Sequence, residues 1–172
     1  MINYQMLSAS EAQQALPELC EVLQACVADG ASVGFIDAAD HQAIDRFWQD
    51  RIYSLASGDA ELWVARQHGS VVATVMINSS SMPNGRHRAE ITKLLVHPQA
   101  RRQGIARQLM LQAEQQARLQ GKTLLVLDTR SGDVASDLYR SLDWQVAGSI
   151  PFYAESTTGE LDATTYMFKL LG

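Results

Sequence analysis

The chain has few cysteines and few prolines: two of the former and four of the latter in 172 residues. Cys20 and Cys26 fall on one predicted helix, where their spacing points the two side chains to different faces, so a disulfide between them is not expected. Two unpaired thiols are typical of a reducing compartment, and we therefore expect a cytoplasmic protein.

Long apolar runs are also missing. No stretch approaches the roughly 18 consecutive apolar residues of a membrane span, and no N-terminal segment combines a basic region with the apolar run of a signal peptide. The formal net charge of −5 argues against a broad nucleic-acid surface. We expect neither a membrane nor a nucleic acid as a partner, and a monomer or a homodimer in solution.

Motifs for several cofactors are absent as well. No two of the four histidines have metal-ligand spacing on a shared element, so no metal site is expected. The chain has no Gly-x-Gly-x-x-Gly and no Gly-Lys-Ser/Thr phosphate loop, which leaves nicotinamide and nucleoside-triphosphate binding without support.

The residues that are present predict one domain spanning residues 1–172. At 47% hydrophobic residues the chain can bury a sizeable core, and it contains no repeat, low-complexity tract or linker. Ser10 to Gln13 has the form of a capping box, and Pro17 should start or kink a helical segment. The apolar spacing predicts helices at about 10–29, 40–57, 105–120 and 134–142, and strands at about 2–7, 61–66, 71–78, 90–97, 123–128, 144–150 and 163–171.

One turn in this series has the chemistry of an anion site. Arg101-Arg102-Gln103-Gly104-Ile105-Ala106 joins a predicted strand to a predicted helix. A helix N-terminus leaves about four backbone N–H groups without partners and carries a partial positive charge, both of which suit a pyrophosphate. A glycine there lets the ligand approach the backbone, and the two arginines add charge.

This turn matches the Arg/Gln-x-x-Gly-x-Gly/Ala signature of the GNAT superfamily of acetyl-CoA-dependent N-acetyltransferases, and the chain resembles that family in element order throughout. The resemblance implies an α/β (α+β) GNAT fold, with a mixed central sheet of about seven strands flanked by about four helices. It also implies that the strands ending at Val96 and Asp128 splay apart to admit acetyl-CoA as cosubstrate. The implied cofactor-binding residues are Leu94, Leu95, Val96, Arg101, Arg102, Gln103, Gly104, Ile105, Ala106 and Arg107.

Scattered segments, densest from Pro83 onward, resemble a narrower group of GNAT enzymes that inactivate a β-lactam amino-acid toxin, tabtoxin, by acetylation. They include Pro83-Asn-Gly85, Lys93-Leu94, Leu127-Asp-Thr129 and the C-terminal Phe168-Lys-Leu-Leu-Gly172. This resemblance implies that the substrate is a small-molecule amine or amino-acid-like molecule, and that the enzyme has a role in antibiotic or toxin resistance. The competing interpretation is a GNAT fold that binds acetyl-CoA as a sensor or partner module without turnover.

Three residues are candidates for catalysis. Tyr139 follows the Asp128 strand, at the family position of a tyrosine that donates to the departing thiolate; the alternative is a tyrosine packed under the sheet. Glu90 can take the proton of the amine, or it is a solvated strand end. Asp128 can bind the ammonium or act as the base, or it caps the next helix. Alternation along the strand predicts that Glu90, Thr92, Leu94 and Val96 share one face.

Two loops are expected near the acceptor. The segment 30–36 is more apolar than a solvated loop requires, so it is either a packed connector or part of a pocket wall. The breaker-rich segment 79–86 is expected to close over a compact ligand together with it, and Tyr153 to add a wall.

Overall fold

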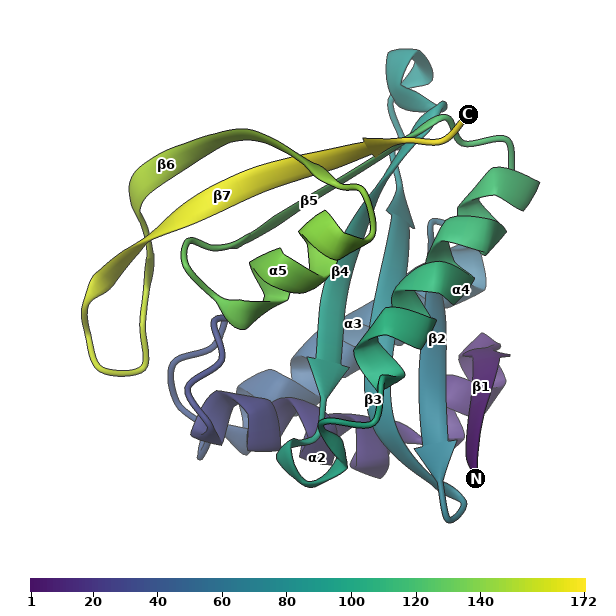
Figure 1. Cartoon of the computed structure of the whole chain (residues 1–172). Coiled ribbons are helices and arrows are strands. Elements are labelled where there is room, and N and C mark those ends of the chain that lie inside the picture. Colours follow the sequence, from purple (N-terminus) through teal and green to yellow (C-terminus); the bar gives the residue numbers. More distant parts are fainter.

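The computed structural model describes all residues, 1–172, and its strands form one seven-stranded sheet in the order β1-β2-β3-β4-β5-β7-β6 (Figure 1). All neighbouring pairs are antiparallel except β4 and β5, which run parallel. The sheet is therefore mixed, as the sequence predicts. The strands are β1 (Ile2–Leu7), β2 (Ala60–Gln67), β3 (Ser70–Ser79), β4 (Arg88–Val96), β5 (Leu124–Arg130), β6 (Gln145–Glu155) and β7 (Leu161–Leu170).

There are five helices rather than about four, because the first predicted helix is divided at Ala15. Pro17 occupies the second position of the second segment, where its missing N–H costs nothing and its fixed φ favours the helix start. None of the five has the length and apolar character required to cross a membrane. The helices are α1 (Ala9–Gln14), α2 (Leu16–Ala28), α3 (His41–Ser57), α4 (Ile105–Leu119) and α5 (Val134–Ser141).

The capping box at the first helix lies two residues before its predicted place. Ser8, not Ser10, is the N-cap, and its hydroxyl accepts from the Glu11 N–H at 3.1 Å. The Glu11 carboxylate accepts in return from the Ser8 N–H at 2.9 Å. Both serines precede a glutamate or glutamine by three residues, so the motif alone did not distinguish them.

The helices cover the two faces of the sheet and create two cores (Figure 1). On one face α4 and α5 pack on Ala89, Ile91, Leu125 and Leu127. On the other face α1, α2 and α3 pack on β2 and β3, with Trp48 fully buried at the centre. Side chains of one strand can therefore be assigned to a face by the core they join.

Strand β4 changes face halfway along its length. Lys93 and Leu94 together oppose one residue of β3, and Lys93 has a φ of 51°, so the strand carries a β-bulge here. Ile91 consequently packs in the α4 and α5 core, whereas Leu95, four residues on, packs in the opposite core. The predicted single face for Glu90, Thr92, Leu94 and Val96 is wrong, because a bulge resets the period of two.

Strands β4 and β5 separate soon after they begin. Their pairing runs only from Arg88–Leu124 to Glu90–Val126, and beyond Glu90 strand β4 has no partner on its β5 side. The splay that the family resemblance implies is thus present. It leaves an unpaired strand edge facing a gap in the middle of the sheet, between α5 on one side and α3 with the 30–36 loop on the other (Figure 1).

Candidate active site

A cavity of about 400 Å³ occupies the gap between β4 and β5. Its walls come from both strands, from α5, from the β6–β7 hairpin and from the loop after α2. The loop 30–36 therefore forms part of the pocket wall and is not only a connector. The cavity is lined by Ala31, Ser32, Val33, Gly34, Ile91, Thr92, Lys93, Leu94, Leu127, Asp128, Thr129, Arg130, Asp133, Ala135, Tyr139, Tyr153, Ala154, Asp162, Ala163 and Thr164.

Tyr139 and Asp128 reach this cavity from opposite faces of the sheet. Tyr139 belongs to the α4 and α5 core, next to Trp144 at 6.0 Å between ring centroids. Leu127 faces that same core, so Asp128, the next residue of the strand, faces the other way. Asp128 is exposed and accepts a hydrogen bond from the Thr164 hydroxyl at 2.8 Å. It caps no helix, since α5 begins after Asp133.

The Tyr139 hydroxyl keeps its proton throughout the working pH range. Burial, with the negative charges of Asp133 and Asp128 adding to it, raises the pKa of Tyr139 to about 12. The side chain is 6% exposed. At neutral pH this group can donate a hydrogen bond into the gap but cannot act as a base.

Glu90 lies at the closed end of the gap, directly paired with Val126, and shares its face of the sheet with Asp128. It is half-buried rather than a solvated strand end, and it borders the cavity without lining it. Burial first, and then the charge of Asp128, raise the pKa of Glu90, while Lys93 opposes the shift. A carboxyl with a raised pKa is a better proton acceptor near neutral pH.

A second hollow, of about 230 Å³, lies where β4 turns into α4. Gly104 is the helix N-cap with a left-handed φ of 75°, and no side chain caps the helix. The first backbone bond of α4 runs from the Gln108 N–H to the Gly104 carbonyl, so no N–H from Arg102 to Arg107 has a partner in the protein. The lining residues are Val96, Ala100, Arg101, Arg102, Gly104, Ile105, Ala106, Arg107 and Leu138.

The side chains of this turn are less free than the sequence suggested. Arg101 forms an ion pair with Asp29 and donates to the Val96 carbonyl at 3.3 Å. Gln103 is bonded to Gln67 at 3.0 Å, and Arg107 donates to the Ser141 hydroxyl at 2.8 Å. Of the three arginines, Arg102 alone forms no ion pair and donates no side-chain hydrogen bond. Arg101 lines the hollow as predicted, but its charge there is shared with Asp29.

The apolar members of the predicted cofactor set divide between different places. Leu94 lines the cavity in the gap, and Val96 and Ala106 line the hollow at the turn. Ile105 borders that hollow, but its side chain is almost fully buried in the α4 core. Leu95 points into the opposite core, so only its backbone remains available to a ligand.

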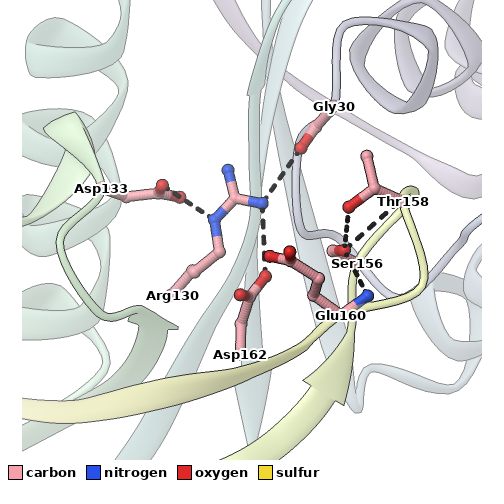
Figure 2. A network of polar contacts seen from close by, with 7 residues as sticks. All are labelled: Gly30, Arg130, Asp133, Ser156, Thr158, Glu160 and Asp162. Atoms are coloured by element: carbon pink, nitrogen blue, oxygen red, sulfur yellow. Dashed lines mark hydrogen bonds and ion pairs between the residues drawn. The ribbon is translucent and has the colours of Figure 1, made fainter.

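The acceptor side of the cavity has a scaffold that sequence reasoning missed. Arg130 donates to Asp133 at 2.9 Å and to the Gly30 carbonyl at 3.2 Å, and lies 3.8 Å from Asp162 (Figure 2). One guanidinium thus ties the loop after α2 to α5 and β7. In the hairpin turn, the Ser156 hydroxyl accepts from the N–H groups of Thr158 and Glu160 (Figure 2). Gly30 and Asp162 are far from Arg130 in the chain, so no local pattern indicated that they meet it.

The prediction that the loop 79–86 closes over the ligand is wrong. The loop precedes β4, so it lies at the start of that strand, whereas the gap opens toward the strand's end (Figure 1). None of its residues lines the cavity. Tyr153, by contrast, does line it, and its hydroxyl lies 2.9 Å from that of Tyr166. No group of three or more His, Cys, Asp or Glu side chains is arranged to hold a metal ion.

Comparison with known proteins decides the family. The model of the acetyltransferase (GNAT) family matches residues 16–144, which is well over half of the chain and includes the gap and the turn. The chain belongs to the GNAT family of acetyltransferases. It is accordingly an N-acetyltransferase with acetyl-CoA as its cosubstrate.

Individual relatives agree with this assignment. An uncharacterized N-acetyltransferase from the hisH–hisA intergenic region of Azospirillum brasilense is 28% identical over 117 residues, covering 67% of this chain and 68% of that protein. Ribosomal-protein-alanine N-acetyltransferase from Brucella melitensis superposes with a TM-score of 0.80 at 20% identity, over 98% of this chain and 99% of that one. YncA from Salmonella typhimurium, a protein solved with acetyl-CoA, superposes with a TM-score of 0.78 at 20% identity, over 100% of this chain and 95% of that one.

Proposed function

We propose that this GNAT enzyme acetylates a small zwitterionic amine of amino-acid type, a class that includes β-lactam amino-acid toxins such as tabtoxin. The observation that carries the proposal is the charged cavity of about 400 Å³ between β4 and β5, whose size suits a compact ligand. The resemblance of scattered segments to tabtoxin-resistance acetyltransferases supports the same class of acceptor and a role in detoxification.

The residues on the two faces of the gap have different roles in the reaction: the carboxylates act on the acceptor amine, and Tyr139 acts on the departing sulfur. Asp128 binds the ammonium of the acceptor, and Glu90, directly or through one water, takes its proton. The neutral amine then attacks the thioester carbonyl, the new C–N bond forms, and the C–S bond breaks as the excess proton on the nitrogen passes to the departing sulfur. Tyr139 donates a hydrogen bond to the departing sulfur from the α5 side. The products are an acetamide and coenzyme A.

The α4 turn fits the pyrophosphate of acetyl-CoA. The free N–H groups from Arg102 to Arg107 provide several donors, and the helix dipole adds a partial positive charge at the same point. Arg102 supplies an unpaired cation beside them. The unpaired edge of β4, including the backbone of Leu94, Leu95 and Val96, is available to the amide groups of the pantetheine arm.

Replacing Gly104 by valine should raise the KM for acetyl-CoA by about tenfold or more and leave the fold intact. Its φ of 75° is costly for a β-branched residue, while a Cβ there would contact no protein atom within 4 Å. The turn should therefore distort locally and the new side chain should obstruct the ligand. Steady-state thiol release gives the KM, and calorimetry gives the affinity for acetyl-CoA directly.

The matched control is Gly121→Val at the other end of α4, where φ is 79° and the space is equally open. It imposes a similar strain far from the turn and should leave acetyl-CoA affinity near the wild-type value. Equal affinity in Gly104→Val and wild type would remove the turn from the cofactor site.

Asp128→Asn should weaken acceptor binding by about 10-fold to 100-fold, since a hydrogen bond to a charged group is worth roughly 1.5–3 kcal/mol, with acetyl-CoA affinity kept. It should also shift the pH profile. The charge of Asp128 raises the pKa of Glu90, so its removal lowers that pKa. A base acts when deprotonated, and the acidic limb of kcat/KM should therefore move to lower pH.

The control is Asp137→Asn, which removes a charge from the exposed side of α5. It should leave the acidic limb of the kcat/KM profile at the wild-type pH. An Asp128→Asn profile that coincides with the wild type in both KM and pH limb would contradict the assignment of Asp128.

The proposed function is tested by following thiol release from acetyl-CoA with amino-acid toxins, polyamines, aminoglycosides and peptide N-termini as acceptors. We expect the amino-acid class to give the highest kcat/KM. Preference for a long peptide or protein acceptor over every small amine would overturn the proposal, as would thiol release with none of the acceptors.

A further inference from the structure

Two cations beside the active-site cavity have no anionic partner. The Lys93 ammonium lies 4.9 Å from the centroid of the Phe47 ring, and the Arg51 guanidinium carbon lies 5.4 Å from the same centroid. Neither forms an ion pair within 4.0 Å, and neither donates a hydrogen bond through its side chain. Each of the cations that brace the surrounding scaffold, such as Arg130 and Arg101, is paired with a carboxylate.

The burial of these two groups makes the missing partner significant. The Nε atom of Arg51 is buried without any hydrogen-bond partner, and such atoms are uncommon in folded proteins. Burial, and then repulsion from Arg51, lower the pKa of Lys93. Two like charges held close together at partial burial are costly unless an anion compensates them.

The loop after α2 adds free donors at the same place. Beyond Ala31, whose N–H is bonded to the Cys26 carbonyl, no backbone N–H from residue 32 to residue 36 has a partner in the protein. A Cβ on Gly34 would lie 4.0 Å from the Lys93 ammonium, and Gly34 has a φ of 93°. Because Arg130 holds the Gly30 carbonyl, the loop is fixed against the cavity (Figure 2).

We propose that Lys93, the loop N–H groups and the charge of Arg51 form a subsite for the carboxylate of the acetyl acceptor. Lys93 lines the cavity and contacts the anion; Arg51 does not line it and acts through the positive potential that it adds. This inference rests on the proposed function, and it names the acceptor's second charge and the residues that bind it.

The arrangement of charges matches one class of molecule. Glu90 and Asp128 supply two negative charges, while Lys93 and Arg51 supply two positive ones. The other three charges all lie close enough to act on Lys93: burial and Arg51 lower its pKa, and Asp128 and Glu90 raise it. An α-amino acid presents its ammonium and its carboxylate to two such groups at once, whereas an amine without a carboxylate satisfies only the first.

The test compares the common L-amino acids with their carboxamides, which keep the amine and lose the negative charge. We expect the wild-type enzyme to prefer the acid by about 10-fold to 100-fold in kcat/KM, the range for hydrogen bonds to charged groups. In Lys93→Gln this ratio should fall close to one, and in Arg51→Gln it should fall part of the way.

The matched control is Arg46→Gln, which removes an exposed arginine from the same helix as Arg51 and should keep the wild-type ratio. A wild-type enzyme that accepts carboxamides as well as acids would overturn the subsite while leaving the proposed function in place. So would a Lys93→Gln variant that keeps the preference.

A binding measurement separates this inference from the proposed function. Calorimetry of the coenzyme A-loaded protein should show tighter binding of an L-amino acid than of its carboxamide in the wild type, and loss of the difference in Lys93→Gln. If this binding result is obtained but no acceptor gives thiol release, the proposed function is refuted and the carboxylate subsite is not. Equal or absent binding of acids and carboxamides would refute the subsite.

Discussion

Replacing Tyr139 by phenylalanine should lower kcat by about 10²–10³, the usual cost of removing one hydrogen-bond donor from a developing charge, while acetyl-CoA affinity changes little. Only a hydroxyl is lost, and the ring keeps its packing beside Trp144. The hydroxyl, with a pKa of about 12, is present as a donor at every accessible pH. Steady-state thiol release, together with calorimetry for acetyl-CoA, measures both quantities.

The high pKa of Tyr139 also determines how the hydroxyl can assist the departing thiolate. A thiol has a reference pKa near 8.5, so Tyr139 is the weaker acid, and full transfer of its proton to the thiolate would leave a buried tyrosinate. We therefore expect the hydroxyl to stabilise the developing charge by hydrogen bonding. The wild-type rate should consequently show no basic limb caused by Tyr139 below about pH 10.

Tyr153→Phe is the matched control for this prediction. Tyr153 also lines the cavity, but its hydroxyl lies 2.9 Å from that of Tyr166 and on the acceptor side. This change should alter the KM of the acceptor more than kcat. A Tyr139→Phe enzyme with near-normal turnover would return Tyr139 to a packing role.

The sequence was informative where function depends on backbone. The turn Arg101–Ala106 predicted a helix N-terminus with free N–H groups, and α4 begins at Ile105 after a left-handed Gly104. These features are local, since a glycine followed by an amphipathic helix determines them. The side chains of the same turn were not predictable, because Arg101 meets Asp29, which lies 72 residues away in the chain.

The β-bulge at Lys93 is a second feature that the sequence did not predict. Its strand has no glycine or proline near the bulge, and a lysine with a φ of 51° is uncommon. The bulge is set by pairing with β3, where the Thr74 hydroxyl donates to the Lys93 carbonyl at 2.8 Å. Alternation therefore predicted the wrong face for the second half of β4. For the same reason the sequence did not indicate that Lys93 lines the cavity, although it is the one cation of this strand that does.

The error with the loop 79–86 has a topological cause. A loop rich in breakers looks like a lid wherever it lies, but its position depends on the direction of the strand that it precedes. Since β4 pairs with β5 only over its first residues, the gap opens at the far end from this loop. The order of elements predicted the fold, but the end at which the gap opens came only from the family resemblance.

Glu90→Gln should lower kcat/KM by about 10²–10⁴, as expected for loss of a general base, without change in acetyl-CoA binding. Glutamine has nearly the same shape, and the strand pairing of residue 90 with Val126 and Asn78 uses only its backbone. The carboxylate of Glu90 is suited to the role because burial and Asp128 raise its pKa toward neutrality. It borders the cavity without lining it, so the proton reaches it most directly through one water.

The pH profile distinguishes a base from a carboxylate that only attracts the substrate. A raised pKa means that Glu90 is protonated to a higher pH than an ordinary glutamate, and activity should rise as it loses that proton. In Glu90→Gln the acidic limb should disappear, whereas in Asp128→Asn it should persist at lower pH. Glu155→Gln, at the exposed end of β6, removes the same carboxylate elsewhere and should keep the wild-type limb. A Glu90→Gln enzyme that retains the limb and loses less than tenfold in kcat/KM would assign the base to Asp128, the other carboxylate on that face of the gap.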